Sequence, residues 1–130
     1  MGIVAVDFDG VINSYTSGWN KDNPLDLPDP PVPGALQFLI DLHNAGHKVV
    51  IFTSRARYDG AQSAILGYLL RGYLAMKVRR REYEDFLVNV EVTAVKPPAF
   101  VTLDDRAITF TGTFPSMEEI ETFKPWNKRG

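Results

Sequence analysis

Short apolar segments that end directly in acidic or hydroxyl residues constrain the fold of this chain more than any other feature. Residues 3–6, 48–52 and 99–103 are such segments, and they read as buried parallel strands. Residues 34–45 and 61–69 lie between the first and third of them and repeat apolar side chains at helical spacing. Alternating strands and helices predict an α/β fold with a mainly parallel sheet.

Glycine and capping residues set the expected helix boundaries. Gly46 predicts the end of the first helix, and Asp59 and Gly72 are expected to cap and to end the second. Ser116, with Glu119 at the capping-box position, predicts a brief final helix.

The remaining segments are assigned by composition. Residues 73–85 are ambiguous and rich in charge, so we expect a solvated face there. Residues 86–92 are expected to form the third strand, and 108–110 a short edge strand. A chain of 130 residues fits one core, and we expect a single three-layer Rossmann-like domain over residues 1–130.

A proline-rich loop is expected at about 13–33. Five prolines from Pro24 onward exclude a helix or a central strand in its second half. Loops of this length are either functional or plain surface connections, and both interpretations stay open. Trp19 lies in the proline-free first half, where it either stacks on a substrate base or covers the first helix.

Bulk composition excludes several classes of function. Fourteen Lys and Arg against sixteen Asp and Glu give a net charge of −2, so no global basic field attracts nucleic acid or anionic lipid. The absence of cysteine excludes disulfides, thiolate metal sites and cysteine nucleophiles. No basic n-region precedes the first apolar run, and no run approaches the roughly 18 apolar residues of a membrane span. We therefore expect a soluble, cytoplasmic protein with no membrane partner.

Chemically active side chains follow the predicted strands at one edge of the sheet, where open parallel sheets bind ligands. They are Asp7, Asp9, Thr53, Ser54, Arg55, Asp104 and Asp105, and the loop with Lys96 arrives just before the last strand. Four carboxylates at one edge raise one another's pKa values unless a cation lies among them. Oxygen donors without His or Cys favour Mg²⁺.

These residues resemble the four motifs of the haloacid dehalogenase (HAD)-like hydrolase superfamily. Residues 7–11, Asp-Phe-Asp-Gly-Val, resemble the first motif and residues 50–53, Val-Ile-Phe-Thr, the second. Lys96 resembles the third, and Thr-Leu-Asp-Asp at 102–105 the fourth. The motifs occur in the family's order and span most of the chain.

The resemblance implies a Mg²⁺-dependent phosphatase that acts through an aspartyl-phosphate. By it, Asp7 is the nucleophile, Asp9 the general acid and base, and Thr53 and Lys96 bind the phosphoryl group. The implied metal ligands are Asp7, Asp9, Asp104 and Asp105. Which of Asp104 and Asp105 ligates the metal directly is left open. Ser54, Arg55 and Trp19 are the residues that we expect to contact the substrate.

The spacing between the motifs leaves no room for a large cap domain, so the chain resembles a capless or minimally capped member. An open site implies either a bulky substrate, such as a nucleotide or a nucleic-acid end, or closure by a second copy in a homo-oligomer. More generally, we expect the substrate to be a phosphorylated small molecule. Specificity resides in loops and is not readable from the sequence.

Three alternatives compete with this interpretation. A receiver domain needs a phospho-accepting Asp where this chain has Thr53-Ser54-Arg55. An EF-hand needs a glutamate at its twelfth position, where Gly18 stands. A catalytically weak phosphoryl-binding or scaffold protein of the same fold is the remaining alternative, although every chemical position is filled.

Overall fold

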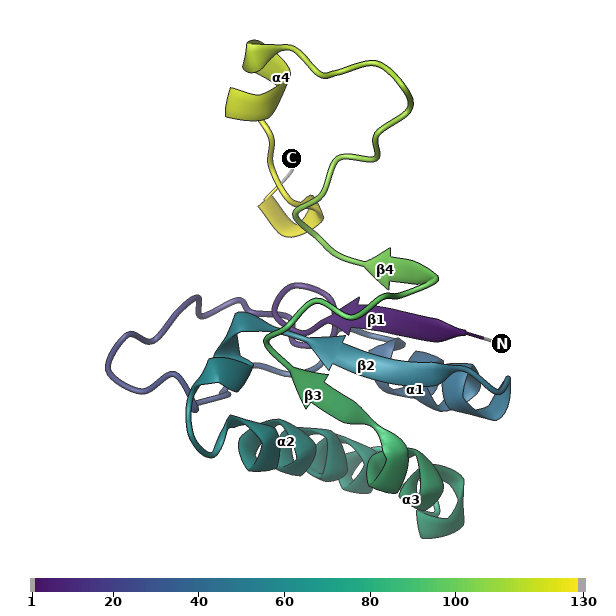
Figure 1. Cartoon of the computed structure of the whole chain (residues 1–130). Helices are drawn as coiled ribbons and strands as arrows, with labels where there is room; N and C mark the ends of the chain where they lie inside the picture. Colours follow the sequence, from purple (N-terminus) through teal and green to yellow (C-terminus); the bar gives the residue numbers. More distant parts are fainter. Residues whose placement is uncertain (1, 129–130) are drawn as a thin grey trace.

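Four parallel strands form one sheet in the order β3-β2-β1-β4 (Figure 1). The computed structural model describes residues 2–128. The strands are β1 (Ile3–Asp7), β2 (Lys48–Phe52), β3 (Glu91–Thr93) and β4 (Val101–Leu103). Helices connect β1 to β2 and β2 to β3, which confirms the expected α/β, Rossmann-like fold with a parallel sheet.

The register of the two central pairings aligns the strand ends. Val6 pairs with Ile51 of β2 on one side and with Leu103 of β4 on the other. The residues that follow these positions therefore leave the sheet side by side. This alignment brings Asp7 next to Asp104.

The three longer helices lie on one face of the sheet. They are α1 (Ala35–Asn44), α2 (Ala61–Ala75) and α3 (Arg80–Asn89), and each of them contacts the other two. The connection from β3 to β4 crosses the opposite face, in front of β1 and β2 in Figure 1. Ala5 and Val50, which lie outside the helix-side cluster, are nevertheless buried. The sheet is therefore covered by helices on one face and by an irregular segment on the other.

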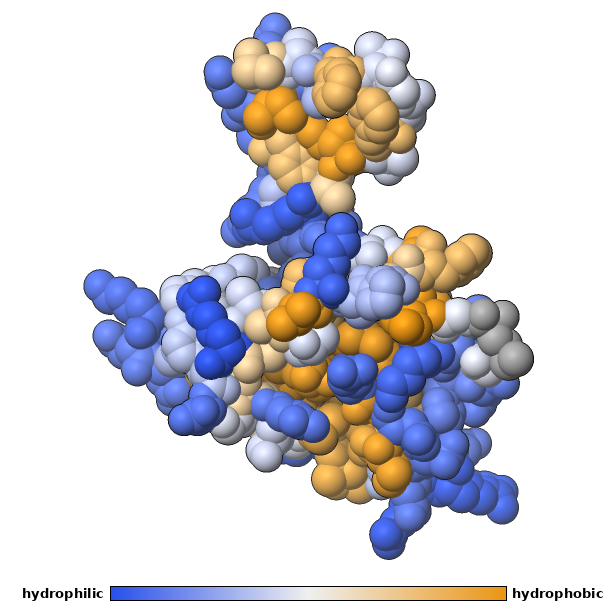
Figure 2. Space-filling view, viewed as in Figure 1, coloured by the Kyte–Doolittle hydropathy of each residue, from blue (hydrophilic) through white to orange (hydrophobic). Residues whose placement is uncertain are grey.

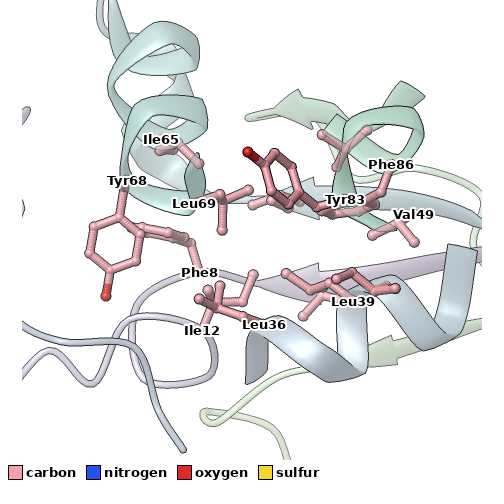
Figure 3. Close-up of a cluster of buried hydrophobic side chains, with 14 of the residues drawn as sticks. Phe8, Ile12, Leu36, Leu39, Val49, Ile65, Tyr68, Leu69, Tyr83 and Phe86 are labelled. Atoms are coloured by element: carbon pink, nitrogen blue, oxygen red, sulfur yellow. The ribbon is translucent and has the colours of Figure 1, made fainter. Parts of the chain in front are cut away.

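The core lies between the sheet and the helices (Figure 3). Val4, Val6, Val49 and Ile51 project from β1 and β2 toward buried side chains of the helices, and no residue in this cluster is charged. Phe8 follows β1 and is fully buried, and its ring meets the edge of Tyr68 at 5.3 Å between centroids. Phe8 thereby fixes the backbone between Asp7 and Asp9.

The second helix begins and ends elsewhere than expected. Gly60, with a φ of 84°, precedes α2, so the expected cap at Asp59 is wrong. Gly72 does not end the helix, because α2 continues to Ala75. A Cβ at position 72 would lie 2.4 Å from Leu36 Cδ1. Gly72 is therefore a contact glycine that lets α1 approach α2.

Lys77 supplies the left-handed residue that ends α2, with a φ of 60°. Its N–H donates to Leu74 O, and the Val78 N–H donates to Tyr73 O at 3.1 Å, which is the Schellman pattern. The first helix ends in the same way at Gly46, whose φ is 91°. The prediction for Gly46 is confirmed.

Residues 86–92 were expected to be a strand, and this is wrong for most of them. Helix α3 runs to Asn89, and β3 begins only at Glu91. Tyr83, Phe86, Leu87 and Val90 are the buried or half-buried apolar residues here, and their spacing of i, i+3, i+4, i+7 is helical. The helical spacing of the apolar residues, and not their high β propensity, therefore indicates the observed structure. The charged side chains at 79–82 are exposed, as expected, although Tyr73 and Tyr83 are buried and stacked at 5.1 Å.

The proline-rich loop contains no helix or strand, as expected. Asp29 anchors its two halves to each other. The Asp29 carboxylate accepts from the Ser17 N–H at 2.9 Å and from the Thr16 and Ser17 hydroxyls at 3.0 and 2.6 Å. The Asp29 carbonyl also accepts from the Tyr68 hydroxyl at 2.9 Å. These bonds fix the loop to α2.

The chain after β4 leaves the sheet. Strand β4 is shorter than the expected 99–103, and residues 108–110 form no strand, since no strand edge lies beside them (Figure 1). Ser116 caps α4 (Met117–Glu121) by accepting from the Glu119 N–H at 3.0 Å, which confirms that prediction. We call residues 106–125 the arm; it leads to the final 3₁₀ turn, Trp126–Lys128.

Candidate active site

Three carboxylates meet at the carboxyl edge of the sheet. Asp7 ends β1, and Asp104 and Asp105 directly follow the neighbouring strand β4. One carboxylate oxygen of each lies within 4.8 Å of the corresponding oxygens of the others. Adjacent parallel strands therefore bring together side chains that are almost a hundred positions apart in the sequence.

This proximity changes the ionisation of Asp7. Burial is the largest cause that raises the pKa of Asp7 from 3.8 to about 8, followed by a hydrogen bond with Asp105 and by the charges of Asp104 and Asp105. The Phe8 N–H, which donates to Asp7 Oδ1 at 2.8 Å, lowers the same pKa by a smaller amount. Without a cation, Asp7 therefore holds a proton at neutral pH.

The Asp105 carboxylate is enclosed. Its side chain is 4% exposed, and its Oδ1 has no hydrogen-bond partner within residues 2–128. Gly10 makes room for it: a Cβ there would lie 2.1 Å from Asp105 Oδ2, and the φ of Gly10 is +86°. The glycine after Asp9 is thus required by both backbone and space.

Asp9 lies apart from the three carboxylates and is held by Arg55. The Arg55 Nε donates to Asp9 Oδ1 and Oδ2 at 3.0 and 2.8 Å, and the Asn13 amide donates to Asp9 Oδ1 at 2.9 Å. Arg55 is buried and also donates to the Pro24 carbonyl. It was expected to contact substrate, whereas here it contacts a carboxylate of the site itself.

The end of β2 supplies hydroxyl groups. Thr53 is buried, its hydroxyl accepts from the Arg55 N–H at 3.3 Å, and its own proton remains available for donation. Ser54 follows it and begins a 3₁₀ turn, Ser54–Arg57. Both residues line the cavity that also contains Asp7 and Asp9.

That cavity has a volume of about 390 Å³ and is lined by carboxylates and by aromatic side chains. Trp19 and Tyr15 come from the proline-rich loop, and Arg106 follows the acidic pair. The Trp19 ring lies over the Arg55 guanidinium at 4.7 Å. Trp19 is 41% exposed, so a ligand in the cavity can reach part of it.

Two expected site residues, Arg55 and Lys96, do not line the cavity; Arg55 lies behind it on Asp9, and Lys96 is not brought to the site.

Lys96 belongs to an irregular segment. It is exposed, lies in the connection from β3 to β4, and is absent from the cavity lining. The remaining expected residues are Asp7, Asp9, Thr53, Ser54, Trp19, Asp104 and Asp105, and all of them line it.

Sequence reasoning missed three residues that touch this site. Asn13 holds Asp9 from one turn further along the chain, and Arg106 directly follows the acidic pair. The Trp126 Nε1 donates to Gly10 O at 2.7 Å across 116 positions. Proximity in sequence could have found the first two, but no local signal indicates Trp126.

Within residues 2–128, no helix has both the length and the apolar character needed to cross a membrane. No family model, no curated protein and no solved structure matches the chain.

Proposed function

We propose that this protein is a Mg²⁺-dependent phosphohydrolase of the HAD type, with Asp7 as the nucleophile. The observation that carries the proposal is the convergence of the Asp7, Asp104 and Asp105 oxygens within 4.8 Å. Three carboxylates so close together, one with a pKa raised to about 8, require a counter-charge in order to ionise together.

The residues fit Mg²⁺. Asp7, Asp104 and Asp105 offer only oxygen donors, and the buried Asp105 Oδ1 has no partner within residues 2–128. A hard cation prefers such ligands and retains waters and phosphate oxygens in its remaining positions. Bound Mg²⁺ would supply positive charge for the ionised carboxylates and for the phosphoryl oxygens.

The chain's own groups divide the reaction between them. The Asp7 carboxylate attacks phosphorus, and the bond from phosphorus to the leaving oxygen breaks as Asp9 donates a proton to that oxygen. Asp9 then accepts a proton from water, whose oxygen displaces Asp7 and releases inorganic phosphate. The Thr53 hydroxyl donates to a phosphoryl oxygen, and Arg55 holds Asp9 in position.

For the substrate, we favour a nucleotide or a nucleic-acid end with a terminal phosphate. Tyr15 and Trp19 border the same cavity as the carboxylates, so a planar base joined to a bound phosphate would lie against an aromatic surface. Base stacking on aromatic side chains contributes about 1–3 kcal/mol per base in single-strand binders. Arg106 lines the cavity as well and adds positive charge.

Phosphate release from an aryl phosphate and from a panel of nucleotides, sugar phosphates and end-phosphorylated oligonucleotides tests the proposal. We expect release with Mg²⁺, none in excess chelator, and none from the Asp7→Asn variant, which is nearly isosteric but lacks the nucleophile. Full turnover in chelator after metal stripping, or near-normal rates in Asp7→Asn with an unchanged fold, would refute it.

A phosphoryl-binding protein without turnover is the second candidate, and the placement of Lys96 favours it. Lys96 is exposed and outside the cavity lining, so the group expected to neutralise the phosphoryl oxygens is not beside them. Binding of substrate with no phosphate release from any member of the panel would support this candidate.

A further inference from the structure

The arm exposes five large apolar side chains within about twenty residues. Its large apolar side chains are exposed by 45% at Ile108, 60% at Phe110, 82% at Phe114, 69% at Met117 and 49% at Ile120. Figure 2 shows apolar side chains gathered on this part of the molecule, apart from the body. Contiguous apolar patches of this kind mark interaction sites.

Both ends of the arm are attached beside the candidate active site. It begins at Arg106, directly after the two site aspartates, and it ends before Trp126, whose Nε1 donates to Gly10 O at 2.7 Å. Between these points the arm stands off from the sheet beyond β4 (Figure 1). Its anchors therefore hold its apolar side chains away from the body of the same chain.

The body carries a complementary apolar surface, which we call the band. One groove of about 260 Å³ lies between β4 and α1, with Leu103 and Phe38 in its lining. A second, of about 370 Å³, lies between the beginning of α1 and the end of α2, where Met76 lines it. Both grooves share residues 32–34, so the band is continuous. Phe38, Met76 and Leu103 are 40%, 49% and 41% exposed.

Helix α4 of the arm is acidic, and two basic residues lie at the α2 end of the band. Residues 107–123 of the arm contain three glutamates, all in α4, whereas its two basic residues, Arg106 and Lys124, lie at its ends. At the α2 end, Lys77 directly follows Met76, and a third groove that shares Gln37 with the band is lined by Arg81 and by Glu82. Lys77 and Arg81 are exposed and form no ion pair with any residue in 2–128.

We propose that a second copy of this chain receives the arm in its band, and that the two copies exchange arms reciprocally. Phe114, Met117 and Ile120 would then lie against the apolar grooves, with the α4 glutamates beside Lys77 and Arg81. One chain carries both halves of the contact. A two-fold exchange therefore satisfies both arms and both bands at once and closes the assembly.

Molar mass measured by light scattering over a range of protein concentrations is the first test. We expect twice the 14.6 kDa of one chain. The double variant Phe114→Ser, Met117→Ser should raise the dimer dissociation constant about tenfold or more. Val88→Ser is the matched control, because Val88 is 78% exposed but lies on α3, outside the arm and the band. A monomer at every concentration, or equal effects of both variants, would overturn the proposal.

Cysteine pairs identify which chain receives the arm, because the protein has no cysteine of its own. One variant carries Phe114→Cys in the arm and another carries Phe38→Cys in the band. Under oxidation, a mixture of the two should yield a disulfide-linked heterodimer, whereas a mixture of Val88→Cys with Phe38→Cys should not. A third variant carries both Phe114→Cys and Phe38→Cys. If it forms its disulfide within a monomer, the arm occupies its own band and the second copy is excluded.

Charge reversal separates this docking from mere apolar association. Glu118→Lys with Glu121→Lys should weaken the dimer, and Lys77→Glu with Arg81→Glu should weaken it as well. Mixing the two reversed chains should restore association, because each arm of the mixed dimer then meets a band of opposite charge. Failure of the mixture to associate better than either parent would contradict the placement of α4 beside Lys77 and Arg81.

Discussion

Arg55 binds the carboxylate of Asp9, with its Nε donating to both oxygens at 3.0 and 2.8 Å. The arginine side chain is 3% exposed, and its guanidinium lies under the Trp19 ring at 4.7 Å. Few rotamers of Asp9 are compatible with these contacts. Arg55 is therefore a positioning residue for the proposed general acid and base.

Replacing Arg55 with lysine should lower kcat by about tenfold to a hundredfold, because the charge stays but the planar donor geometry is lost. The value of KM for a small aryl phosphate should change little. Arg57→Lys is the control: Arg57 lies two residues away, is exposed, and contacts the Tyr58 hydroxyl. A change in the pH–rate profile of Arg55→Lys, but not of Arg57→Lys, would separate positioning of Asp9 from a general loss of structure. Equal profiles would refute the positioning role.

The raised pKa of Asp7 predicts how the stability of the metal-free protein depends on pH. The pKa is 3.8 in the unfolded chain and about 8 in the folded one. Between these values the folded state holds a proton that the unfolded state has lost, so the free energy of unfolding decreases as pH rises from about 4 to 8. Urea unfolding in chelator at several pH values measures this. In Asp7→Asn the slope over this range should become flatter.

The affinity for Mg²⁺ should depend on the ionisation of Asp7. Since Mg²⁺ requires ionised carboxylates, its binding to this site would release the Asp7 proton, and affinity should rise between pH 5 and 8. Thermal denaturation with and without Mg²⁺ at each pH measures the stabilisation. Stabilisation that is independent of pH, or that persists in Asp7→Asn, would place the ion elsewhere.

Gly10→Ala should abolish metal binding and turnover. The added Cβ would lie 2.1 Å from Asp105 Oδ2, and the φ of +86° adds strain for a residue with a side chain. Gly18→Ala is a matched control, because Gly18 has a φ of +73° but nothing within 4 Å of the added Cβ. It should cost about 1–2 kcal/mol of stability from backbone strain alone, with Mg²⁺ affinity unchanged. Equal Mg²⁺ affinity in the two variants would refute the steric argument.

The arrangement of the site was predictable where it depends on strand order. Buried apolar runs give parallel strands, their carboxyl ends share one edge, and Asp7 and Asp104 consequently meet. The ends of strands carry this information because a short apolar run is a local pattern in the sequence. Lys96 lacks such support: it lies in an irregular connection, whose path no periodicity specifies.

Errors in the fold arose where one residue type serves two physical purposes. Gly72 was interpreted as a helix end, but it permits contact with Leu36, while the left-handed position belongs to Lys77. Residues 86–89 are rich in β-forming side chains, yet the helical spacing of Tyr83 and Phe86 buries both rings. Contacts between distant elements decide such cases, and a single sequence does not display them.

Trp19→Ala tests whether the aromatic side chains that line the cavity recognise a base. If it does, kcat/KM for nucleotide or oligonucleotide phosphates should fall about tenfold or more, from the stacking energy of about 1–3 kcal/mol. A small aryl phosphate should be affected little. Trp19 also covers Arg55 at 4.7 Å, so a structural role predicts a lower Tm and equal losses for all substrates. Those two results together would exclude base recognition by Trp19.

Gly67 and Gly72 offer a test of the helix packing that does not depend on function. Both lie inside α2, so replacing either with alanine gains about 0.8–1.0 kcal/mol of helix propensity. At Gly67 the nearest obstacle is Arg71 Nη1 at 3.3 Å, the end of an exposed, flexible side chain. Gly67→Ala should therefore stabilise the protein by up to about 1 kcal/mol.

Gly72→Ala should do the opposite. Its Cβ would lie 2.4 Å from Leu36 Cδ1, and Leu36 is buried at 3% exposure, so α1 and α2 must move apart or Leu36 must leave its rotamer. Overpacking of this kind costs about 1–3 kcal/mol, which exceeds the gain in propensity. Urea unfolding of both variants measures the difference in sign. If Gly72→Ala is as stable as Gly67→Ala, the close approach of α1 to α2 is not maintained in solution.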